Sequence, residues 1–101
     1  MSIRLLNERE LNFQLYEVLD TEALLQRPRY AEHDRAVFDA TLETARAIAT
    51  DYLAPHNQKG DANEPTFDGE KVTLIPETKL AWAALSQAGF HAAHHDAEYG
   101  G

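Results

Sequence analysis

The chain contains no cysteine and carries little positive charge, and each shortage narrows what the protein can be. Without cysteine, disulfide scaffolds, thiolate zinc sites and cysteine nucleophiles are excluded, and the composition fits a reducing compartment. Lys and Arg number 9 against 17 Asp and Glu, which gives a net charge of −8. Because an acidic surface repels phosphate backbones and anionic lipid, we expect no nucleic-acid partner and no docking on charged membranes.

Long apolar runs are also missing. No stretch reaches the length that spans a membrane, and residues 1–8 lack the apolar run of a signal peptide. We therefore expect no membrane span and a cytoplasmic location. The 101 residues suffice for one domain at most. Hydrophobic residues make up 44% of them, which is normal for a globular protein and gives no compositional case for disorder.

The main pattern in the sequence is the spacing of apolar residues at helical periodicity. A first helix is predicted over 8–20, where apolar residues fall in one arc. A short second helix is predicted over 22–26, with Asp20 and Thr21 as caps and Pro28 as its end. Phe13 and Tyr16 lie off the apolar arc of the first helix. They are either singly exposed aromatics or contacts to a partner surface, and the pattern leaves both readings open.

The longest helix is predicted from Asp34, as a cap, to Leu53, with Pro55 closing it. Its apolar residues form one broad stripe and its alanines a second, narrow strip, so it is expected to pack on two sides. The broad stripe consists of Val37, Phe38, Leu42, Ala45, Ile48, Ala49, Tyr52 and Leu53. The narrow strip consists of Ala36, Ala40 and Ala47.

No helical pattern is visible over 54–76, where a polar loop is predicted for 56–64. A hairpin is predicted around the turn signal Asp68-Gly69. The last helix is predicted to begin at Pro76 and to stop at Gly89, with Trp82 in the core. The predicted fold is mainly α, a helical up-down bundle-like domain with a small β-hairpin.

The densest group of potential metal ligands is His91, His94, His95 and Asp96. On a helix, His91 would share a face with His94 or His95, as a metal site needs. Glycines on both sides favour a short loop or a single turn, and no third ligand stands at a fixed distance. We therefore interpret the run as a solvated loop and predict no metal ligand. Carboxylate pairs and glycine-rich phosphate loops are equally missing, so no catalytic or cofactor-binding residue is predicted.

Several short motifs occur in an order that resembles a known family. The most specific are Leu53-Ala54-Pro55, Gly89-Phe90 and Glu98-Tyr99-Gly100-Gly101. Together with Asp68-Gly69 and Trp82, they resemble the N-terminal helical domain of acyl-CoA dehydrogenases. Residues 13–20 resemble the extra N-terminal helical segment of a larger bacterial subgroup. The resemblance implies an N-terminal helical extension over 1–33 and the family's helical domain over 34–101, with Gly100-Gly101 as the start of further structure.

In that family FAD accepts hydride from an acyl-CoA thioester, and a glutamate of a later domain is the catalytic base. The resemblance therefore implies an oxidoreductase of fatty acid metabolism, a flavoprotein that is a homo-oligomer. This domain would form a wall of the acyl pocket and support a following β-domain. By itself, residues 1–101 are expected to lack FAD and activity and to self-associate. The alternative is a stand-alone helical interaction or dimerisation module, and a weaker third reading is a histidine-based metal binder.

Overall fold

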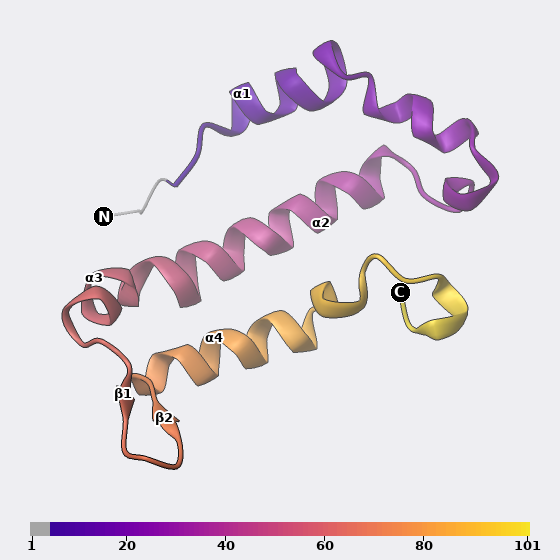
Figure 1. Cartoon of the computed structure of the whole chain (residues 1–101). Coiled ribbons are helices and arrows are strands. Elements are labelled where there is room, and N and C mark those ends of the chain that lie inside the picture. The colour runs from indigo at the N-terminus through magenta and orange to yellow at the C-terminus, as the bar shows by residue number, and fades with distance from the viewer. Residues whose placement is uncertain (1–4) are drawn as a thin grey trace. The chain divides into compact units, whose positions relative to one another are not determined.

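The structure, a computed structural model, describes residues 5–101 and is mainly helical with one two-stranded antiparallel sheet (Figure 1). This confirms the predicted mainly α fold with a small hairpin. The chain divides into two compact units, one ending at Arg46 and the other running from Ala47 to Gly101. The division rests on contacts within each unit, so the boundary at 33/34 that the resemblance implies stays a prediction.

A helix is present where one was predicted over 8–20, but only its first part is an α-helix. It begins as α1 (Glu8–Asn12) and continues as a π-helical segment over Phe13–Val18. The side chain of Asn7 accepts a hydrogen bond from the N–H of Glu10 at 3.1 Å, which satisfies one of the free donors of the first turn.

The short second helix is present as a 3-10 helix over Thr21–Gln26, and a further 3-10 turn covers Pro28–Tyr30. The prediction that Asp20 caps it was wrong. Asp20 takes a left-handed conformation with φ of 49°, and its side chain makes no capping hydrogen bond. The chain has to reverse after the π turn, and Asp is one of the few residues that tolerate this conformation. The hydroxyl of Thr21 donates instead to the carbonyl of Leu15 at 2.6 Å.

The long helix begins as predicted. Asp34 caps α2 (Arg35–Ile48), because its Oδ1 accepts from the N–H of Val37 at 2.8 Å. With 14 residues α2 is the longest α-helix among residues 5–101. A π-helical segment over Ala49–Leu53 extends it to the predicted end.

Two predictions beyond Leu53 were wrong. Pro55 does not close the helix, and the expected loop over 56–64 is largely helical, because α3 (Ala54–Ala62) follows the π segment directly. Proline lacks an N–H and its ring clashes with the carbonyl four residues earlier. The wider π turn just before Pro55 gives that ring room, and Pro55 then lies in the first turn of α3, where its missing donor costs nothing.

The predicted hairpin is confirmed. Strands β1 (Thr66–Phe67) and β2 (Val72–Thr73) pair antiparallel, with Thr66 opposite Thr73 and Phe67 opposite Val72. Gly69 supplies the positive φ of 100° that the turn needs. The carboxylate of Asp68 accepts from the N–H groups of Glu70 and Lys71, both at 2.9 Å. These hydrogen bonds hold the pKa of Asp68 below its usual range.

The last long helix, α4 (Pro76–Gln87), also matches its prediction, and Gly89 ends it with a φ of 83°. Two 3-10 turns follow, over Phe90–Ala92 and Ala97–Tyr99. Within the C-terminal unit, α4 packs against the π segment that precedes Pro55. Glu77 in its first turn pairs with Lys59 of α3 at 2.9 Å, and this hydrogen-bonded partner lowers the pKa of Glu77.

Very little of this structure is closed off from water. Among residues 5–101, only Ile48 and Ala81 are buried apolar residues. The prediction that Trp82 lies in the core was wrong, because its side chain is 63% exposed. The stripe on the long helix is fully buried only at Ile48 and partly buried at residues such as Phe38 and Leu42. Both of its ends are open, since Val37, Tyr52 and Leu53 are exposed. Periodicity located the apolar faces, but it could not say that this chain leaves most of them open.

Candidate functional site

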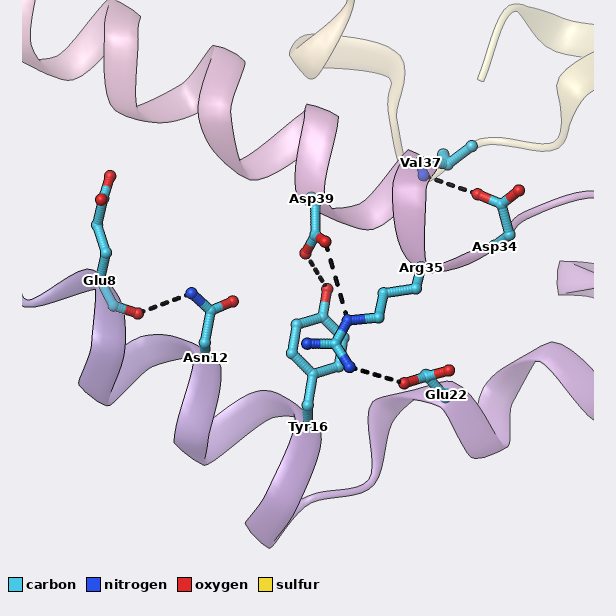
Figure 2. Close-up of polar contacts among 8 residues, drawn as sticks. All are labelled: Glu8, Asn12, Tyr16, Glu22, Asp34, Arg35, Val37 and Asp39. Atoms are coloured by element: carbon cyan, nitrogen blue, oxygen red, sulfur yellow. Dashed lines mark hydrogen bonds and ion pairs between the residues drawn. The ribbon is translucent and has the colours of Figure 1, made fainter.

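The most connected group of polar side chains in the N-terminal unit is the Tyr16 cluster, made by Tyr16, Glu22, Arg35 and Asp39 (Figure 2). The hydroxyl of Tyr16 donates to Oδ1 of Asp39 at 2.6 Å. The guanidinium of Arg35 lies over the Tyr16 ring, 3.9 Å from its centroid. The same guanidinium pairs with Glu22 at 3.3 Å and with Asp39 at 3.9 Å.

Each member is placed by local helical structure. Arg35 and Asp39 are four residues apart on α2, so they share one face of that helix. Tyr16 comes from the π segment and Glu22 from the 3-10 helix that follows it. The cluster therefore joins three helical segments of the unit, and Arg46 adds an ion pair with Glu8 at 3.3 Å.

The electrostatics of the cluster suit a structural contact between the N-terminal segment and α2 better than proton transfer. Partial burial raises the pKa of Tyr16 to about 12, with the hydrogen bond to Asp39 and the charge of Asp39 as further causes. At neutral pH the phenol is therefore a fixed donor. Arg35 is a permanent cation, and the side chains of Arg35 and Asp39 are about half exposed to solvent. The arrangement can bind the N-terminal segment to α2, and it offers no nucleophile with a base beside it.

This finding bears on the two readings of Phe13 and Tyr16. Tyr16 is half-buried and its ring and hydroxyl both contact α2, so it is neither a singly exposed aromatic nor open to a partner. Phe13 is exposed, and a partner contact there stays a prediction. Sequence reasoning missed Arg35 and Asp39. The signal that could have found them is their spacing of four residues together with an aromatic residue off the stripe of the preceding helix.

The histidine run of the C-terminal unit does not form one regular helix, because the end of a 3-10 turn, a further turn and a bend cover it. The ring of His91 lies against Trp82 of α4, with centroids 4.2 Å apart. The rings of His94 and His95 lie 4.0 Å apart. Within residues 5–101 no three His, Asp or Glu side chains are grouped as metal ligands. His91, His94, His95 and Asp96 are all exposed, as the solvated-loop interpretation expects, and the absence of a metal ligand stays a prediction.

Both flanks of α4 in the C-terminal unit carry open apolar side chains. Ala81 is buried, but Leu80 on one side of it is 61% exposed and Trp82 on the other side is 63% exposed. A helix with apolar residues on more than one side expects neighbours on more than one side. Exposed apolar patches of this kind mark contact sites more often than chemistry.

Comparison with protein families, with curated proteins and with solved structures finds no match to this chain. In the part of the chain that the structure describes, no helix is both long and apolar enough to cross a membrane. Function must therefore be argued from the faces and clusters described above and from the resemblance of the short motifs.

Proposed function

We propose that this chain is the N-terminal helical part of a flavin-dependent acyl-CoA dehydrogenase, in which it forms a wall of the acyl pocket and supports a β-domain. The observation that carries the proposal is the open apolar surface on both flanks of α4. A domain that closes on itself buries its large side chains, whereas a domain that forms one wall of a shared interior keeps them uncovered until its neighbours are in place. The ordered motifs that end at Gly100-Gly101 support the choice of this family by resemblance.

We assign no step of the reaction to residues 5–101, because the resemblance implies that the flavin site and the catalytic base belong to later domains. Here Gly69, Gly89 and Gly100 have positive φ values, and each belongs to a turn or a helix end. In the proposed enzyme, bound FAD would accept the hydride. The share of this chain is to exclude water from the acyl group and to position it.

The test begins with the encoding DNA. If the proposal holds, the reading frame continues past codon 101 for several hundred codons, and the full product purifies with bound flavin. Its visible absorbance then bleaches when an acyl-CoA thioester is added without oxygen, because hydride has passed to the flavin. A full product that binds no flavin, or whose flavin ignores acyl-CoA thioesters, would refute the proposal.

The second candidate is a stand-alone helical interaction module without catalytic activity. The same open flanks favour it, because they need a partner whether or not that partner lies in the same chain. The two candidates differ in their genes. A stop codon directly after Gly101 favours the module and excludes the dehydrogenase.

A further inference from the structure

An open groove of about 740 Å³ lies between β2 and the first turns of α4. Residues 71–76 form one side, and Thr78, Lys79 and Trp82 form the other. No residue of β1 lines it, so the groove follows the edge of β2 that faces away from β1. We call it the β2–α4 groove. Its size lies within the range of about 300–1,000 Å³ that is usual for ligand sites.

The backbone along this groove has no strand partner. The N–H of Asp68 donates to the carbonyl of Lys71 at 3.3 Å, so these two residues form the hydrogen-bonded pair next to the turn. Opposite pairs alternate in an antiparallel ladder. The backbone groups of Val72, and in the same register those of Leu74, therefore point away from β1. Within residues 5–101 neither backbone group of Leu74 makes a hydrogen bond. Such an edge is a template on which an extended chain can pair.

The side chains around the groove combine apolar surface with positive charge. Val72 is 61% exposed and Leu74 is 50% exposed, and Trp82 lies across from them. Lys71 and Lys79 are exposed, and no ion pair involves either of them in the described part of the chain. The third lysine, Lys59, is already paired with Glu77. In a chain with a net charge of −8, two uncompensated ammonium groups beside one apolar groove favour a ligand that is both apolar and negative.

We propose that the β2–α4 groove binds an extended, acidic peptide segment of a partner protein, which adds to β2 as a further strand. The open backbone groups select an extended peptide, because a small anion would leave Val72 and Leu74 unpaired. Alternate apolar side chains of the peptide pack on Val72, Leu74 and Trp82, since side chains alternate along a strand. Acidic residues at its two ends reach Lys71 and Lys79. The proposal does not depend on the dehydrogenase assignment.

The experiment titrates the whole chain with the synthetic peptide Glu-Val-Thr-Val-Thr-Val-Glu in 0.15 M salt, where exposed charges act over only about 8 Å. Trp82 is the only tryptophan, so its fluorescence reports the groove, and amide NMR shifts at Val72 and Leu74 report the edge. We expect saturable changes at all three residues. The Lys71→Glu/Lys79→Glu variant should bind about tenfold more weakly, whereas Arg9→Glu/Arg27→Glu, with the same change of charge in the N-terminal unit, should bind within about twofold of the parent chain.

Two further probes separate strand addition from simple charge attraction. Leu74→Pro removes the edge donor and should abolish binding. If that variant disturbs the hairpin, the unmodified chain is titrated with the same peptide N-methylated at alternate residues, and binding should again be lost. Four results would overturn the proposal. The first is no change at Trp82 and Leu74, and the second is equal binding when lysines replace both glutamates of the peptide. The third is the same shifts with inorganic phosphate alone. The fourth is concentration-dependent amide shifts at Val72 and Leu74 without peptide, which would assign the strand edge to a second copy of the chain.

Discussion

Replacing Tyr16 with Phe removes one hydroxyl from the Tyr16 cluster and should destabilise the N-terminal unit by about 1 kcal/mol. A hydrogen bond to a charged group contributes about 1.5–3 kcal/mol when it is well buried. A value below this range applies here because the side chain of Asp39 is 50% exposed and its charge is partly screened. The ring stays, so the contact of 3.9 Å with the Arg35 guanidinium is kept. Tyr16→Ala loses that contact as well and should cost about 2 kcal/mol in total, since a cation–π contact at an exposed site is worth about 0.5–1 kcal/mol.

The assay has to report on the correct unit. Trp82 lies in the C-terminal unit, so its fluorescence would miss the effect, and amide hydrogen exchange over residues 8–26 is the appropriate measurement. A loss of about 1.4 kcal/mol corresponds to tenfold faster exchange where local opening limits it. Tyr30→Phe is the matched control, because Tyr30 also lies in the N-terminal unit and its hydroxyl makes no hydrogen bond among the described residues. If Tyr16→Phe speeds exchange no more than Tyr30→Phe does, the cluster does not hold the unit together.

The same hydroxyl makes a prediction about pH. The pKa of Tyr16 is raised to about 12 in the folded chain, against about 10 for an unfolded tyrosine. A group whose folded pKa is raised contributes stability that is complete below the unfolded value and is lost as pH rises through the folded value. The stability difference between the parent chain and Tyr16→Phe should therefore be constant up to about pH 10 and shrink between about pH 10 and 12. A difference that stays constant up to pH 12 would show that the hydroxyl is not held as described.

Four further predictions concern the whole chain. Purified residues 1–101 should be colourless and inactive on acyl-CoA thioesters, and a yellow protein with stoichiometric FAD would contradict this. Micromolar zinc should leave the melting temperature unchanged, and a rise that His94→Ala/His95→Ala abolishes would revive the metal reading. Residues 1–101 should self-associate through the Leu80 flank of α4, so light scattering after gel filtration should give a dimer mass that Leu80→Glu reduces to a monomer; a monomer at high concentration would show that the flank needs no cover. Gly89→Ala should cost about 1 kcal/mol in urea unfolding because φ is 83° there, whereas an unchanged midpoint would show that the helix end adapts.

The sequence predicted those elements whose signals are local. The Asp34 cap, the Asp68-Gly69 turn and the Gly89 stop each depend on a few neighbouring residues, and each was confirmed. The helix over Ala54–Ala62 was missed because its polar sequence has no apolar stripe and begins with Ala54-Pro55. Only the π turn before Pro55 allows the helix to continue, and no sequence pattern used here predicts a π turn.

The Tyr16 cluster shows a different limit. Its members lie 4 to 23 residues apart along the chain, so no local window contains all of them. The exposure of Trp82 could not be predicted from the sequence for a related reason. An indole favours burial on average, but burial depends on how many neighbours the rest of the chain supplies, and this chain supplies few near α4.

The two units are held by different kinds of interaction, and this difference indicates where partners belong. The N-terminal unit joins its helical segments through the polar contacts of Tyr16 and Arg35, which need water-tolerant geometry but little apolar cover. The C-terminal unit buries Ile48 and Ala81 and leaves apolar side chains open on both flanks of α4. Apolar side chains that are still exposed would stabilise this chain if a partner buried them. A partner, whether a later domain or another protein, would therefore gain most by covering the C-terminal unit, on the Leu80 flank or along the β2–α4 groove.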